Sequence, residues 1–151
     1  MRAHWLDTED ALTTETLRQE LVLCATLPLD DYQPSLDALR RERGYVQQDR
    51  IELSPTTPGL ESICARFVDE HVHDDDEVRF ILEGEGIFDV RSRDDRFMRI
   101  VVEAADLIVV PAMRNHRFFL TASRTIRAVR LFKDPAGWVP RYRTPDARSA
   151  S

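Results

Sequence analysis

The sequence has few of the features that mark secreted, membrane or nucleic-acid-binding proteins. It contains only two cysteines, Cys24 and Cys64, whose spacing fits neither a metal motif nor a disulfide framework. No apolar run approaches the roughly 20 residues of a membrane helix, and the mixed, acidic stretch from Met1 to Asp10 is unlike a signal peptide. The net charge of −6 disfavours general binding of nucleic acids, which depends on neutralisation of their phosphates by Lys and Arg. We therefore expect a cytoplasmic protein with reduced thiols and with neither nucleic-acid nor membrane partners.

Length and composition indicate a single folded domain. Hydrophobic residues make up 42% of the 151 residues and charged residues 32%, which is typical of a soluble globular protein. Two domains would each be short of a core at this length. We expect the domain to span residues 1–143, with a helical part at about 10–67, a barrel at about 70–133 and a frayed tail at 144–151.

The first 70 residues show mainly helical spacing. Apolar residues recur every three or four positions from Thr13 to Leu27, which predicts one amphipathic helix. Pro34 and Gly44 are typical of the start and the end of a second helix. The pattern from Leu60 to Phe67 predicts a third helix, and a short strand is expected from Tyr45 to Leu53.

From His71 onward the pattern changes to short β-rich runs. They are divided by turn-forming residues such as Gly84-Glu85-Gly86. Many short strands at close spacing predict a sandwich or a small barrel. The expected strands are Glu77 to Leu82, Ile87 to Arg91, Phe97 to Val102, Leu107 to Val110, His116 to Leu120 and Ile126 to Phe132.

Three of the four histidines fall in two short motifs, and His4 is left as an expected surface residue. His71 and His73 are two positions apart, so on a strand they point to the same face. Glu77 follows closely, and His116 lies on a later strand. Three imidazoles and a carboxylate suit Fe(II), Ni(II), Mn(II) or Zn(II). On an octahedral ion, four ligands leave two positions where neighbouring substrate oxygens can chelate.

The spacing of these motifs resembles the cupin superfamily, and within it the acireductone dioxygenase family. The first motif is His-x-His-x3-Glu-x6-Gly from His71, and the second is Pro-x4-His from Pro111. The resemblance covers roughly residues 35 to 143. It is carried by Leu39–Tyr45, His71–Val90, Asp106–Pro111, His116–Phe118, Arg130–Phe132 and Trp138–Arg143.

The resemblance implies a mainly β fold, a cupin-type double-stranded β-helix barrel with N-terminal flanking helices. It implies one Fe(II) or Ni(II) per chain on His71, His73, Glu77 and His116, and dioxygen and the acireductone 1,2-dihydroxy-5-(methylsulfanyl)pent-1-en-3-one of methionine salvage as substrates. With iron the family yields formate and 4-methylsulfanyl-2-oxobutanoate. With nickel it yields formate, carbon monoxide and 3-methylsulfanylpropanoate. We expect a monomer.

Further positions match the family's pocket. Arg79 lies two residues after Glu77 and so faces the same interior, where its permanent charge would favour an ionised enediol. The alternative for Arg79, and for Arg130 on the last strand, is a salt bridge within the barrel. Glu70 and Asp76 match acidic neighbours of the ligands, and the alternative for them is a solvated acidic run. The apolar pocket positions are Phe67, Ile81, Phe88, Phe118 and Phe132.

Two positions depart from the cupin pattern. Ala105 and Met113 stand where cupins usually carry glycine. A side chain held at positive φ costs on the order of 1 kcal/mol, so we expect the turn from Pro111 to His116 to take another shape, with Met113 extending toward the pocket mouth. Three interpretations stay open: an acireductone dioxygenase, a related cupin that acts on another enediol or diketone, and a non-enzymatic cupin that binds a small ligand. Both arginines favour an enzyme, because a structural cupin has no dianion to stabilise.

Overall fold

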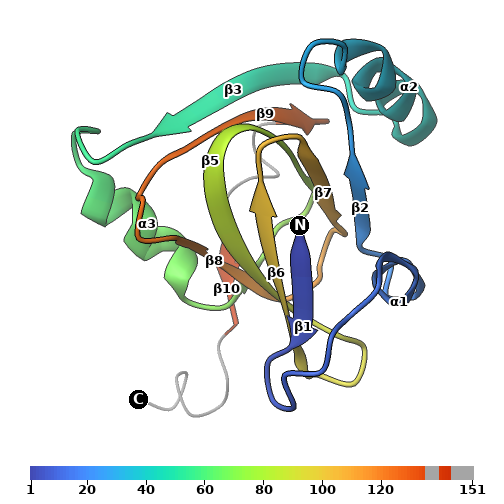
Figure 1. Ribbon diagram of the computed structural model, residues 1–151, viewed down its shortest axis with the longest axis vertical. Coiled ribbons are helices and arrows are strands. Elements are labelled where there is room, and N and C mark those ends of the chain that lie inside the picture. Colours follow the sequence, from blue (N-terminus) through green and yellow to red (C-terminus); the bar gives the residue numbers. More distant parts are fainter. Residues whose placement is uncertain (135–139, 144–151) are drawn as a thin grey trace.

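The computed structural model describes residues 1–134 and 140–143, so the expected tail at 144–151 lies outside the described residues. The chain folds into two antiparallel sheets that share the long, curved strand β5 (Glu77–Arg91), as Figure 1 shows. The prediction of a mainly β cupin barrel is confirmed. One sheet has the order β1-β6-β5-β8-β4-β10, and the other has the order β2-β7-β5-β9-β3. We call them sheet A and sheet B.

The bounds of the other strands are as follows. Sheet A contains β1 (Arg2–Trp5), β4 (His71–Val72), β6 (Phe97–Glu103), β8 (His116–Leu120) and β10 (Arg141–Tyr142). Sheet B contains β2 (Leu23–Thr26), β3 (Gln47–Leu53), β7 (Asp106–Val110) and β9 (Ile126–Phe132).

Strand β5 passes from sheet B into sheet A at Gly84, where two separate strands were expected. Up to Gly84 it pairs with β9, and from Glu85 onward it pairs with β6. Gly84 has a φ of +81°, and a Cβ there would lie 2.0 Å from the carbonyl oxygen of Thr125. The glycine therefore bends the strand at a close backbone contact instead of ending it.

The N-terminal part contains strands where one long helix was expected. Helix α1 (Thr14–Gln19) is short, and β2 follows it and pairs with β7. The predicted helix from Thr13 to Leu27 is therefore wrong beyond its first turns. Its pattern placed Leu21 on the apolar face, but Leu21 has a φ of +66° and a 59% exposed side chain. Pairing with the edge of sheet B outweighs the helical periodicity here.

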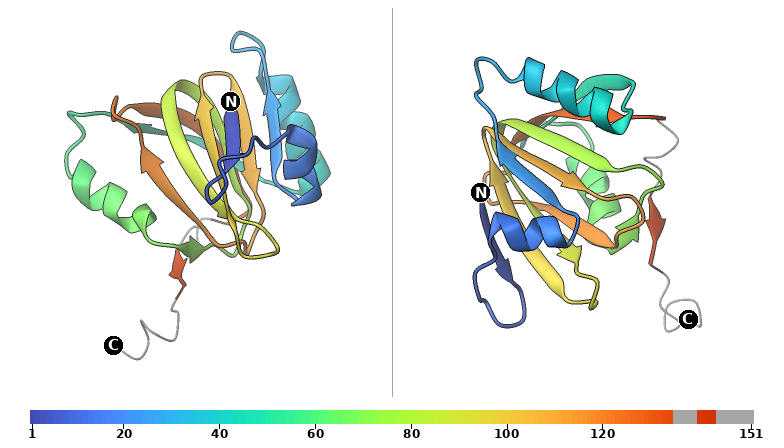
Figure 2. Two further views of the ribbon diagram at one scale, coloured as in Figure 1. Left: turned by 60° about the horizontal axis from the view of Figure 1, so that its bottom comes forward. Right: turned by 90° about the vertical axis from the view of Figure 1, so that its right-hand side faces the viewer.

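The other two helices lie where the sequence places them. Helix α2 (Gln33–Arg43) begins beside a proline and ends at Gly44, whose φ is +79°. Helix α3 (Leu60–Val68) packs against β8. Figure 2 shows α1 and α2 on one side of the barrel and α3 on the other. None of the helices in residues 1–134 and 140–143 is long and apolar enough to cross a membrane.

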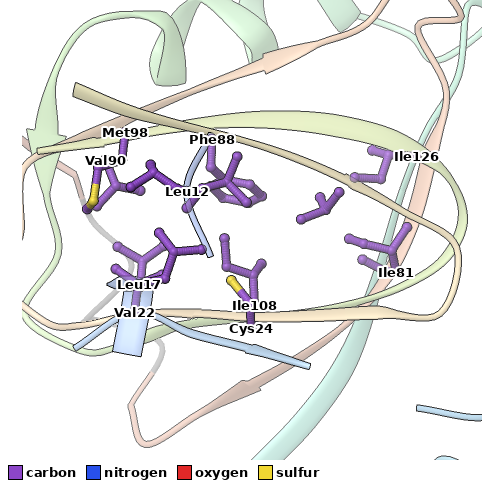
Figure 3. Packing of buried hydrophobic residues seen from close by; sticks show 14 of the residues in the cluster. Leu12, Leu17, Val22, Cys24, Ile81, Phe88, Val90, Met98, Ile108 and Ile126 are labelled. Carbon is purple, nitrogen blue, oxygen red and sulfur yellow. The ribbon is translucent and has the colours of Figure 1, made fainter. Parts of the chain in front are cut away.

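Two apolar clusters hold the sheets in place. The inner cluster fills the space between the sheets, where side chains such as Phe88 and Met98 of sheet A meet Ile108 and Cys24 of sheet B (Figure 3). The outer cluster packs α2 and Tyr45 against the other face of sheet B. Because side chains alternate along a strand, β5 points Val78 and Phe80 into the outer cluster and Arg79, between them, into the barrel.

The turn from Pro111 to His116 keeps the conformation that glycine favours, so the expectation of another shape is wrong. Met113 has a φ of +66°, and Ala105 has a φ of +78°. The backbone N–H of Met113 donates to the carbonyl of His73 (3.0 Å), and that of Ala105 donates to the carbonyl of Ile81 (2.8 Å). These hydrogen bonds hold both residues in a strained conformation.

Candidate metal centre and adjoining cavity

Three buried histidines converge at one end of the barrel. His71 on β4 lies opposite His116 on β8 in the sheet register, and His73 follows β4 directly. Each ring places one nitrogen atom within 4.8 Å of a nitrogen atom of each of the other two rings. The structure therefore brings together the three histidines that the sequence motifs singled out.

Backbone carbonyls orient two of these imidazoles. Nδ1 of His71 donates to the carbonyl of Asp69 (2.8 Å), and Nδ1 of His116 donates to the carbonyl of Arg114 (2.9 Å). A ring that donates through Nδ1 keeps a lone pair on Nε2 when it is neutral. Both rings are thus held with Nε2 available as a ligand atom.

The centre contains buried polar atoms that no described residue satisfies by hydrogen bonding. They are Nε2 of His71, both ring nitrogens of His73, Oε2 of Glu77 and Nε2 of His116. Oε2 of Glu77 lies 2.8 Å from Nε2 of His116, close but without hydrogen-bond geometry. Buried groups without partners are costly. A divalent cation would satisfy three imidazoles and a carboxylate at once, so these residues fit a metal ion.

The protonation states also suit a metal. Burial lowers the pKa of His73 to about 4, and burial together with the neighbouring His116 lowers the pKa of His71. Burial alone would raise the pKa of Glu77, but the charge of Arg79 and the contact with His116 hold it well below its usual value. His71 and His73 are therefore neutral and Glu77 is ionised near pH 7, the forms that bind a cation.

A largely apolar cavity of about 60 Å³ adjoins the histidines through Glu77. Its walls come from both sheets and from α3. Phe67, Phe88 and Phe118, which the resemblance places in the pocket, line it. Sequence reasoning missed four further lining residues: Ile51, Leu53, Ile126 and Ala128. The sequence pattern could have indicated them. Ile51 and Leu53, like Ile126 and Ala128, are two positions apart on a predicted strand and so lie on one face of it.

Two arginines face this cavity, and each is held by a carboxylate. Arg79 donates to Oε1 of Glu77 (2.9 Å) and to the carbonyl of Val78 (2.9 Å). Arg130 makes a two-pronged pair with Asp49 (2.8 and 2.7 Å). Both alternatives weighed from the sequence thus coexist, because each guanidinium forms a salt bridge and also lines the cavity.

Ile81 and Phe132 are buried but do not line this cavity. Ile81 packs in the inner cluster. Met113 is 56% exposed, and its sulfur accepts a hydrogen bond from Arg141. His4 lies on β1, away from the other three histidines, and is only partly exposed. Contact of Ile81 and Phe132 with a substrate, and extension of Met113 toward the pocket mouth, stay predictions.

Two acidic side chains beside the predicted ligands are fixed by hydrogen bonds. Glu70 accepts from Arg91 (2.7 Å) and from Arg143 (2.9 Å), which secures the residue just before His71. Asp76 accepts from the Tyr45 hydroxyl (2.5 Å) and from the backbone N–H of Ala112 (2.8 Å). Neither belongs to a freely solvated acidic run.

Comparison with known proteins agrees with this geometry. The chain matches the ARD/ARD′ family over residues 2–140. It is 44% identical over 140 residues to an acireductone dioxygenase of Heterostelium pallidum, with 93% of this chain and 96% of that protein covered. It is 43% identical over 145 residues to an acireductone dioxygenase of Dictyostelium discoideum, with 93% and 97% covered.

A solved structure matches over nearly the same length. It is an acireductone dioxygenase from Bacillus anthracis with a cadmium ion in its active centre. The TM-score is 0.88 at 29% identity, with 93% of this chain and 97% of that chain covered. The family predicted from the histidine motifs is thereby confirmed: this chain belongs to the ARD/ARD′ family, the acireductone dioxygenases.

Proposed function

We propose that this protein cleaves 1,2-dihydroxy-5-(methylsulfanyl)pent-1-en-3-one with dioxygen in methionine salvage. The observation that carries the proposal is the set of unsatisfied ligand atoms on three buried histidines and Glu77, directly beside an apolar cavity with two arginines. The family and its 43–44% identical relatives support the substrate. The experiment that tests it is oxygen-dependent turnover of this acireductone by the metal-reconstituted protein.

The metal site is proposed to hold one Fe(II) or Ni(II). Its ligands would be His71, His73, Glu77 and His116, with Nε2 the donor atom of the first and the last. When bound, the ion would supply a Lewis-acidic centre that the two neighbouring oxygens of an enediol can chelate. The cadmium in the Bacillus anthracis relative supports a divalent cation in this class of site.

The residues of the chain would bind and orient the substrate. Arg79 places a buried positive charge beside Glu77, where it would favour the ionised enediol over the neutral one. Arg130 lies opposite Arg79 on the neighbouring strand β9, and Asp49 holds its guanidinium in one orientation. The phenyl rings of the cavity would take the methylsulfanyl tail and exclude water from it.

The same protein is expected to give different products with different metals. Reconstituted with Fe(II), it should yield formate and 4-methylsulfanyl-2-oxobutanoate. With Ni(II), it should yield formate, carbon monoxide and 3-methylsulfanylpropanoate. The reason is that one ligand set serves either ion, and the described residues contain no other cluster of metal-binding side chains.

Product analysis with headspace carbon monoxide measured would check this expectation. One product set with both metals would assign the choice of cleavage to the protein. Full metal occupancy without consumption of the acireductone would favour another enediol or diketone as substrate, or a cupin that only binds a ligand.

Gly86 is expected to set the shape of the cavity. A Cβ at this position would lie 2.6 Å from Cε1 of Phe118 and 3.2 Å from Cδ1 of Ile126, and both side chains line the cavity. Gly86→Ala should displace them and lower the free energy of unfolding by about 1–3 kcal/mol. The KM for the acireductone should rise, because the displaced side chains would take up space in the cavity.

Steady-state kinetics would measure this change, with metal content as the control. A shorter acireductone without the methylsulfanyl group should be affected less, because the cavity has less of it to accommodate. An equal rise for both substrates would contradict a role of the cavity in binding the tail.

We further propose that residues 1–143 form one domain, which acts as a monomer in the cytoplasm. Pairing of β1, β2 and β3 with barrel strands supports one domain. Cys24 and Cys64 are both free thiols, which suits a reducing compartment. Light scattering on the purified protein would test the monomer.

A further inference from the structure

The loop between His73 and Glu77 carries two proposed metal ligands, and its acidic side chains are tied to other parts of the fold. Asp75 is buried, and its Oδ2 accepts from the backbone N–H of Lys133 at the end of β9 (2.7 Å). Its Oδ1 accepts from the backbone N–H of Asp76 (2.8 Å). The first bond holds the loop against the end of β9 in sheet B, and the second fixes the Asp75 side chain within the loop.

Two hydrogen bonds join this loop to the turn that leads to His116. Oδ1 of Asp76 accepts from the backbone N–H of Ala112 (2.8 Å), and the carbonyl of His73 accepts from the backbone N–H of Met113 (3.0 Å). The carboxylate of Asp76 therefore spans the two segments on which His73, Glu77 and His116 are carried. Its orientation affects the separation of these ligands.

Tyr45 fixes the other oxygen of this carboxylate. Its hydroxyl donates to Oδ2 of Asp76 at 2.5 Å. The ring is 3% exposed and packs in the outer cluster, directly after the left-handed Gly44 that ends α2. Arg43, by contrast, is 4.0 Å from the same oxygen and more exposed. A buried ring leaves the hydroxyl little freedom, so Tyr45 is the rigid support of the bridge.

We propose that Tyr45 is a positioning residue of the metal centre. Its hydroxyl orients Asp76, which in turn holds the His73–Glu77 loop at a set distance from the turn before His116. Tyr45 touches neither the ion nor the substrate, and it comes from a segment that lies far from the ligands in sequence. The proposal rests on the proposed metal site and is independent of the identity of the substrate.

The test is the affinity of Tyr45→Phe for Ni(II), measured on the full-length protein by competition with a chromophoric chelator. Loss of a residue that hydrogen-bonds to the ligands or their supports typically weakens metal binding by roughly 10–100-fold. For Tyr45→Phe we expect about a tenfold lower affinity for Ni(II). Tyr32→Phe is the matched control. Tyr32 also packs beside the outer cluster and also has a bonded hydroxyl, which accepts from Arg50 (3.2 Å). Its Ni(II) affinity should equal that of the wild type.

A second measurement separates positioning from general stability. Thermal unfolding of both metal-free variants measures how much stability the fold loses with each hydroxyl. In an Asp76→Ala background, Tyr45→Phe should cause no additional loss of Ni(II) affinity, because the bridge is already absent. Equal affinities of Tyr45→Phe and Tyr32→Phe would overturn the proposal, and so would a full additional loss without Asp76. Failure of the wild type to bind Ni(II) would overturn both this proposal and the metal site.

Discussion

Replacement of His73 by alanine is expected to remove most of the bound metal and, with it, the activity. Both nitrogens of His73 are buried without a hydrogen-bond partner among the described residues, so the ring has no structural hydrogen bond to lose. Losing a ligand atom should cost more than the roughly 10–100-fold in affinity that follows loss of an outer partner. Metal analysis after dialysis, together with turnover, would measure both effects.

His4→Ala is the matched control for this substitution. His4 lies on β1 and pairs with Arg99 in the sheet register, far along the chain from the other histidines. Its removal should leave metal content and turnover unchanged. The decisive result would come from a protein in which His71, His73 and His116 are all alanine. If that protein kept one metal ion per chain, the assignment of the ligands would be wrong.

Replacement of Arg79 by alanine is expected to lower turnover while the metal stays bound. The guanidinium forms a salt bridge with Glu77, with Nη2 at 2.9 Å from Oε1. Loss of one well-placed electrostatic contact can cost about 3 kcal/mol, or roughly a hundredfold in rate. The fall should appear in kcat/KM for the acireductone, with metal content near that of the wild type.

Arg127→Ala provides the comparison, because Arg127 lies on β9 and pairs with the exposed Glu83 outside the cavity. Its loss should change turnover little, since exposed ion pairs contribute little. If Arg79→Ala kept wild-type turnover at full metal occupancy, Arg79 would be only the structural partner of Glu77. If metal were lost as well, the main role of Arg79 would be to keep that carboxylate ionised.

In the N-terminal part, the local sequence pattern predicts the wrong secondary structure. From Thr13 to Leu27 the apolar spacing fits a helix, yet β2 forms in its second half and pairs with β7. The edge of sheet B exists only once the barrel has formed. Burial of a residue against that edge stabilises the chain more than its helix propensity does. The two glycines of 84–86 mislead in the same way, because they mark a bend between sheets and not a strand end.

The sequence by itself determined the family and predicted the ligand set. His71, His73, Glu77 and His116 are identifiable because metal chemistry restricts both residue type and spacing, and spacing is a local property. The tertiary structure alone decided which side chains hold the charged residues around the predicted ligands and the cavity. Tyr45 reaches Asp76 across 31 positions and Asp49 reaches Arg130 across 81. Such partners depend on which strands and loops pack together. That packing follows from burial of apolar side chains over the whole chain, so a local sequence pattern does not predict it.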